Sequence, residues 1–291
     1  MSNSSEDSRV LEQWRRNLPT VAVLGLFRWE RNSMTPTYLV LLVTGLLFPV
    51  TLIFLEVGRR LGQRRLVEDP EAARAGAGAV EGAVFALFGL LIAFTFTSAA
   101  SRYETRRDLI VQHANAIGTA WLRLDLLPKE VQPLLRKNFR QYLDAVIKIP
   151  HKFEDMTTAD QMVARVIRLQ DEIWKSAETA ASRDGRPQVA TLVLPALNEM
   201  FDLGATRYAA VKFHVSLVIF WFLFVLSMLA SLLAGYGMGS AKRRNWLYMI
   251  LFSLLVTLTL SVIIDIELPR HGFIRLDKAD NILVELRESM Q

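Results

Sequence analysis

The hydrophobic residues of this chain gather in four long runs that contain almost no charged side chain. A helix needs about 20 apolar residues to cross the hydrocarbon core of a bilayer. The runs meet this length and predict membrane-spanning helices at residues 37–57 and 80–101, with two more inside residues 213–268. The pattern therefore predicts an integral membrane protein.

The segment between the second and third runs has the apolar spacing of amphipathic helices, interrupted by prolines. The second run has no stop signal before Pro128, so one helix of about 45 residues is predicted to leave the membrane. A second long helix is predicted to begin near residue 188 and to continue into the third span. Because strand patterns are missing outside the spans, we predict an all-α fold. Its expected parts are a polar or amphipathic segment (1–36), spans one and two (37–101), a helical domain (102–212), spans three and four (213–268) and a C-terminal tail (269–291).

Composition supports the membrane class and argues against several others. Of the 291 residues, 52% are hydrophobic, and the mean hydropathy is +0.25. The net charge of +5 is too small to suggest nucleic-acid binding, and the absence of cysteine excludes disulfides and thiolate chemistry. Nucleotide-binding glycine loops, a nucleophilic serine elbow and zinc-binding histidine pairs are also missing. We therefore expect no enzyme activity, no cofactor and no metal site.

Basic residues near the predicted spans favour one orientation. Lys and Arg are slightly more numerous on the side that holds residues 102–212 than on the opposite side. Since short cytoplasmic segments carry an excess of Lys and Arg, both termini and the helical domain are predicted to be cytoplasmic.

The second predicted span has two faces that differ in kind when its residues are placed at 100° each. Small residues, which let helix backbones approach closely, form one stripe: Gly82, Ala86, Gly89, Ala93, Thr97 and Ala100. The opposite face changes from apolar to polar and then basic: Val84, Phe88, Leu91, Thr95, Ser98, Arg102, Arg106 and His113. This face could line a pore, with a hydrophobic constriction at Phe88 and Leu91 and an anion-attracting vestibule at its basic end. Alternatively, the apolar residues face lipid and the arginines mark the membrane boundary.

Charged and polar residues near the spans predict several pairings. Glu56 and Glu81 are expected to pair with Arg59 and Arg60, although a role in an ion pathway is the alternative. Structural pairing with Arg102 or Arg106 is the default interpretation for Asp265 and Glu267. A polar network joining the long helices is predicted to include Asn115, Asn198, Asp202, Arg207, Asp265, Glu267 and Arg270. The Gly235-Tyr236-Gly237-Met238-Gly239 sequence is interpreted as a flexible turn between spans three and four.

Several local sequences accompany this layout. They are Ala99-Ala100-Ser101-Arg102-Tyr103, His113-Ala114-Asn115-Ala116-Ile117-Gly118-Thr119, Leu126-Leu127-Pro128 and Asp265-Ile266-Glu267-Leu268-Pro269-Arg270-His271-Gly272. Together with the four runs and the long second helix, they resemble the bestrophin-like domain family of bacterial membrane proteins over about residues 38–280.

The resemblance implies distant kinship with bestrophins, pentameric anion channels whose constriction is built from the second span. It implies an inner-membrane homo-oligomer, expected to be a pentamer, that contacts lipid and conducts small inorganic ions, with chloride or other anions preferred. Calcium gating is not predicted, because no dense acidic loop follows the fourth span. The alternative hypothesis is a non-conducting membrane scaffold whose cytoplasmic helices bind a partner protein, and a monomeric or dimeric state would favour it.

Overall fold

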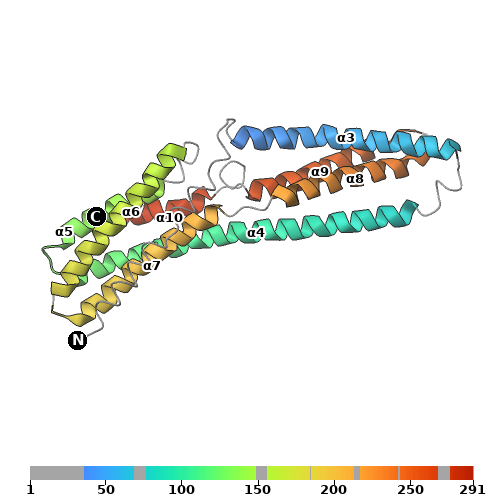
Figure 1. Cartoon of the computed structure of the whole chain (residues 1–291). Helices are drawn as coiled ribbons and strands as arrows, with labels where there is room; N and C mark the ends of the chain where they lie inside the picture. The colour runs from blue at the N-terminus through green and yellow to red at the C-terminus, as the bar shows by residue number, and fades with distance from the viewer. Residues whose placement is uncertain are drawn as a thin grey trace. The chain divides into compact units, whose positions relative to one another are not determined.

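The computed structural model describes residues 36–68, 77–148, 156–183, 185–212, 217–241, 243–267 and 276–290, and these residues contain no strand. The predicted N-terminal segment 1–36 therefore lies almost wholly outside the described residues. The helices are α3 (Pro36–Glu68), α4 (Ala77–Arg123), α5 (Gln132–Lys148), α6 (Met156–Arg183), α7 (Pro187–Lys212), α8 (Leu217–Gly237), α9 (Trp246–Glu267) and α10 (Asp277–Ser289) (Figure 1). The predicted all-α fold is confirmed for this part of the chain.

Three described helices, α4, α8 and α9, are long and apolar enough to cross a membrane. They correspond to the second, third and fourth predicted spans. The first predicted span lies within α3, and its insertion in the membrane stays a prediction.

The apolar helices pack as a bundle in which α3 and α4 each contact both α8 and α9. Bulky aliphatic and aromatic side chains fill the interior, because this removes the most apolar surface from the surroundings. The buried members are Leu47, Phe88, Leu223, Leu226, Met228, Ala230, Val256, Leu260 and Ile263.

Helices α3 and α8 approach each other so closely that only glycine fits at their crossing. A Cβ atom on Gly58 would overlap the backbone oxygen of Leu232, and one on Gly235 would overlap the backbone oxygen of Leu55. Gly62 and Gly239, each four residues further along its helix or the turn that follows, also face each other. Two Gly-x-x-x-Gly sequences thus face each other, an arrangement that allows close van der Waals contact between membrane helices. The prediction of a flexible turn at 235–239 is wrong for its first three residues, because α8 continues to Gly237 and the glycines serve helix packing, whereas residues 238–240 form a 3₁₀ turn.

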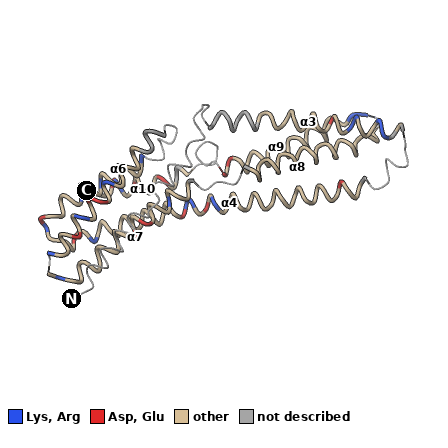
Figure 2. Tube along the Cα trace, viewed as in Figure 1, with Lys and Arg blue, Asp and Glu red and all other residues tan. Residues whose placement is uncertain are grey.

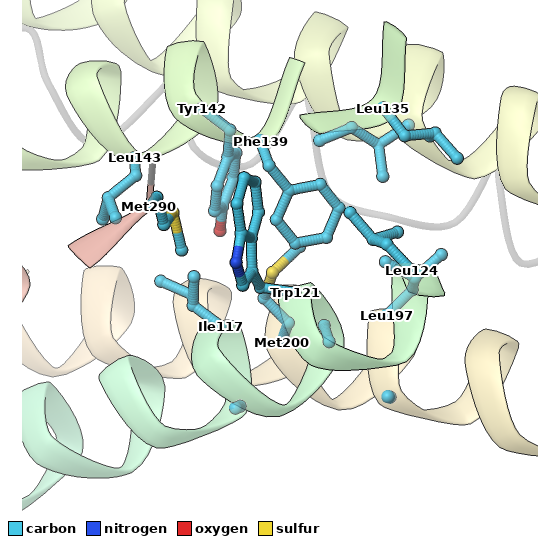
Figure 3. Packing of buried hydrophobic residues seen from close by; sticks show 14 of the residues in the cluster. Ile117, Trp121, Leu124, Leu135, Phe139, Tyr142, Leu143, Leu197, Met200 and Met290 are labelled. Atoms are coloured by element: carbon cyan, nitrogen blue, oxygen red, sulfur yellow. The ribbon is translucent and has the colours of Figure 1, made fainter. Parts of the chain in front are cut away.

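A second core forms beyond the bundle, where α4 packs against α7 and α10, and α5 and α6 pack against each other, with α10 also contacting α5 and α7 contacting α6. Helices α5 and α6 each have one apolar face, and both helices contribute buried residues to this core. Trp121 of α4 lies against Phe139 of α5, with Tyr142, Leu143 and Met290 nearby (Figure 3). Helix α10, which belongs to the predicted C-terminal tail, contributes Leu283 to this core.

Helix α4 runs without a break from the bundle into the helical domain (Figure 1). Its 47 residues confirm the long helix predicted from the missing stop signal. A 3₁₀ turn at Leu124–Leu126 ends it just before Pro128, whose ring disfavours a helical conformation of the residue that precedes it. The predicted continuation of α7 into α8 involves residues 213–216, which lie outside the described residues.

Candidate functional site

Helix α4 turns its predicted pore face toward its own bundle. Phe88 and Thr95 are only 6% and 5% exposed, and Phe88 is part of the buried cluster shared with α8 and α9. Val84 and Leu91 pack partly against the same cluster, whereas Ser98 is exposed. In this arrangement Phe88 and Thr95 are not available to line a path shared between chains.

The stripe of small residues on α4 is open instead. Gly82, Ala86, Gly89, Ala93 and Thr97 are exposed, and a Cβ atom on Gly82 or Gly89 would meet no neighbour within 4 Å. Bulky residues bury more apolar area against α8 and α9 than small residues can. The expectation that the small stripe packs a neighbouring helix is therefore not met within the described chain.

An ion cluster stands where α4, α7 and α9 meet. Glu267, the last residue of α9, is 1% exposed and accepts a hydrogen bond from Arg102 Nε at 3.0 Å. Arg106 Nη2 lies 3.8 Å from the same carboxylate, while Arg106 Nη1 donates to the backbone oxygen of Glu267 and its Nε donates to that of Ala210. Arg106 therefore joins α4 to both α7 and α9.

This cluster shows how the two arginines are engaged within one chain. The predicted pairing of Glu267 with Arg102 and Arg106 is confirmed. Arg106 is 4% exposed, so it is not open to an ion-attracting vestibule, and Arg102 keeps a partly exposed side chain. Asp265 is buried near the same end of α9.

His113 is buried deeper in the helical domain. Its Nε2 lies 3.1 Å from the hydroxyl of Tyr142, and Gly204 of α7 approaches both groups so closely that a Cβ atom there would lie 3.1 Å from each. Burial and the nearby Arg207 guanidinium lower the pKa of His113 to about 3, so the imidazole is neutral. The predicted vestibule role of His113 is therefore wrong for the described chain.

The predicted polar network is present only in part. Arg207 is buried and donates to Asp280 of α10 at 2.8 Å, so it ties α7 to the C-terminal helix. Asn198 donates to Asp202 at 2.8 Å on the exposed surface of α7. Asn115 is exposed on α4, and Arg270 lies outside the described residues.

Three partners in this region were missed by sequence reasoning, namely Tyr142, Gly204 and Asp280. A signal existed for Asp280, because Leu276, Ala279 and Leu283 have the spacing of an amphipathic helix. Burial of the Tyr142 hydroxyl, which raises its pKa to about 12, depends on how four helices pack, and the local pattern carries no such information.

The opposite end of the bundle has a second ion cluster, centred on Glu56. Its carboxylate accepts from Arg59 at 2.9 Å, from Arg60 at 2.8 Å and from Arg244 at 2.6 Å. The predicted pairing of Glu56 with Arg59 and Arg60 is thus confirmed. Glu81 lies beside Gly237 of α8.

Comparison with known proteins places the chain in a family. A search of curated proteins and a search of solved structures found no match. A family model described as Bestrophin-like domain matches residues 36–281, which is most of the chain. The predicted resemblance is confirmed, and the chain belongs to the bestrophin-like family.

Proposed function

We propose that this protein is a homo-oligomeric ion channel of the bacterial inner membrane, with a conduction path lined by the open face of α4. Family membership supports a channel-like function, and the three apolar helices support a membrane location. The proposed oligomer is a pentamer, as the kinship with bestrophins implies.

The observation that carries this proposal is the uncovered length of α4. Only 11% of the residues in the 18-residue apolar stretch of α4 are buried, against 39% in that of α8 and 33% in that of α9. The open face of α4 lies beside the stripe of small residues. It is apolar in the part of α4 that belongs to the bundle (Val80, Leu87, Leu90 and Phe94) and polar beyond it (Ser101, Thr105, Gln112 and Asn115). An apolar constriction followed by a wide polar mouth is a known arrangement for a gated pore.

The charges along α4 support a different preference for the permeant ion from the one expected from the sequence. Arg102 and Arg106 share Glu267, and the buried Asp265 stands two residues before Glu267 in α9, so the formal charges of these two arginines and two acids cancel. On the exposed side of α4, Arg107 pairs with Glu104 at 3.0 Å and lies 3.8 Å from Asp108, which leaves one negative charge per chain. We therefore propose a weak preference for cations in place of the anions expected from the sequence. The reversal potential of reconstituted protein in a KCl gradient tests this preference, and a chloride-selective current would contradict it.

The oligomeric state is the first test of the channel itself. The mass of the detergent-solubilised protein and images of single particles should reveal a ring with a rotation axis along α4. A monomer or dimer would leave no central path, because each chain offers too few spans to enclose one. That result would favour the membrane scaffold that binds a partner protein.

Ion flux in liposomes tests which face of α4 lines the path. Phe94→Ala removes a bulky side chain from the open face and should raise flux severalfold, because a wider apolar constriction admits water more readily. Phe88→Ala, the matched variant on the packed face, should lower stability by about 3 kcal/mol and leave the flux per folded molecule unchanged. The reverse pattern would exclude the open face as the lining.

A further inference from the structure

Arginines crowd the end of the bundle that lies away from the helical domain. Figure 2 shows basic residues gathered at the C-terminal end of α3. Helix α3 continues well beyond its apolar run, to Glu68, and carries Arg59, Arg60 and Arg64 on this extension. The linker between α8 and α9 adds Arg243 and Arg244.

The Glu56 cluster fixes part of this group in place. Glu56 holds Arg59, Arg60 and Arg244 within hydrogen-bond distance, and the glycine crossing fixes α3 against the end of α8. One carboxylate therefore organises three guanidinium groups. The cluster keeps a positive charge after this pairing.

Arg64 and Arg243 add further charge that the described residues do not neutralise. Both are exposed, and neither forms an ion pair with a carboxylate in the described part of the chain. Val57 and Leu61 are exposed on the same stretch of α3 as Arg60 and Arg64. This mixture of apolar side chains and arginines is typical of helix segments at the lipid headgroup level.

Aromatic residues mark the same level on α9. Trp246 and Tyr248 are exposed in its first turn, and the Arg244 guanidinium lies 5.4 Å from the centre of the Trp246 ring. Exposed Trp and Tyr are enriched where membrane helices enter the headgroup region. Arginines beside such aromatic residues are expected at the level of the lipid phosphates.

At the opposite end of the bundle, the arginines of α4 that the structure describes have acidic partners. There Arg102 and Arg106 share Glu267, and Arg107 lies between two carboxylates. Among the described residues, the two ends therefore differ in how their arginines are paired: those of α4 share three carboxylates, whereas Arg64 and Arg243 have none within ion-pair distance.

We propose that the end of the bundle formed by α3, α8 and α9 binds the headgroups of anionic phospholipids, with Arg64 and Arg243 as the principal phosphate contacts. The planar guanidinium group can donate two parallel hydrogen bonds to one phosphate group. The preorganised Arg60 and Arg244 extend the positive surface around them. This inference does not depend on ion conduction and holds equally for a membrane scaffold.

Thermal unfolding in nanodiscs tests the proposal, with intrinsic tryptophan fluorescence as the signal. Wild-type protein should unfold several degrees higher in discs that contain phosphatidylglycerol than in discs of phosphatidylcholine alone, and high salt should reduce this shift. The Arg64→Gln/Arg243→Gln variant should lose more than half of the shift. Arg165→Gln/Arg168→Gln on α6 removes two exposed charges far from the site and should keep the full shift.

Two further measurements test whether the bound phosphate belongs to a lipid and whether binding needs the guanidinium group. Inorganic phosphate in place of phosphatidylglycerol should give no shift, and an equal shift would show a site for free anions and overturn the lipid assignment. Arg64→Lys/Arg243→Lys should keep part of the shift, since the charge remains and only the paired donors are lost. If the glutamine variant kept the wild-type shift, or the lysine variant lost it completely, the proposal would be wrong.

Discussion

Glu267 shows how a single residue sets the chemistry of the membrane boundary. A carboxylate with 1% exposure is costly unless charge partners and hydrogen bonds compensate for the lost hydration. Arg102 and Arg106 supply both, and Arg106 also donates to backbone oxygens of α7 and α9. The two arginines therefore hold helices together, and acidic and carbonyl groups of the protein balance their positive charge.

His113 gives the stability of the helical domain a predictable dependence on pH. Its pKa is about 3 in the folded state against 6.5 for an ordinary histidine, so folding favours the neutral form. Well above pH 6.5 the histidine is neutral in both the folded and the unfolded chain, so it does not oppose folding. As the pH falls from 6.5 toward 3, the unfolded chain binds a proton that the folded chain does not, and the free energy of unfolding falls by up to about 1.4 kcal/mol per pH unit. Between pH 8 and pH 5 we expect a loss of about 2 kcal/mol in the free energy of unfolding.

Chemical unfolding of the wild type and of His113→Gln at several pH values measures this contribution. Glutamine stays neutral, so the variant should lose less stability on acidification than the wild type. Equal slopes for the two proteins would contradict the buried neutral imidazole.

At the scale of elements, the α3–α8 crossing makes a clear prediction. Gly58→Ala places a methyl group against the Leu232 carbonyl oxygen and should lower the free energy of unfolding by about 2 kcal/mol or more. Gly45→Ala on the same helix is the matched control, because a Cβ atom there meets nothing within 4 Å. Its stability should be unchanged or slightly higher, since alanine favours helix more than glycine does. Unfolding of both variants in detergent provides the comparison, and equal effects would contradict the close crossing.

Elements were also the level at which sequence reasoning succeeded best. The uncharged runs and the missing stop signal after Ser101 predict α4, α8 and α9, because helix length and hydropathy are local properties. The direction in which each face of α4 points is not local. It depends on whether Phe88 or the small stripe meets α8 and α9, and a helical wheel contains no information about the partner.

At the scale of the whole molecule, orientation is open to direct measurement because the chain contains no cysteine. Ser240→Cys and Glu178→Cys are exposed single positions at the far end of the bundle and in the helical domain, respectively. With a cytoplasmic helical domain, a membrane-impermeant maleimide should label Ser240→Cys in spheroplasts and Glu178→Cys only after lysis. The opposite labelling would reverse the predicted orientation.

The candidate site was predicted less completely than the fold. Glu267 with Arg102, and Glu56 with Arg59, could be anticipated because they lie at predicted span ends on the same side of the membrane. The contacts of His113 with Tyr142, and of Arg207 with Asp280, join segments far apart in the sequence. Such contacts follow from tertiary packing, which a single sequence without an established fold does not specify.

The unbroken course of α4 has a mechanical consequence. At 1.5 Å per residue, its 47 residues form a rod of about 70 Å without a proline to act as a joint. A helix without a joint couples its two halves, so a displacement of its far end by α7 or α10 would be passed along its axis toward the apolar half, where Phe88 packs against α8 and α9. The helical domain thus contacts one end of a stiff connection whose other end carries Leu90 and Phe94.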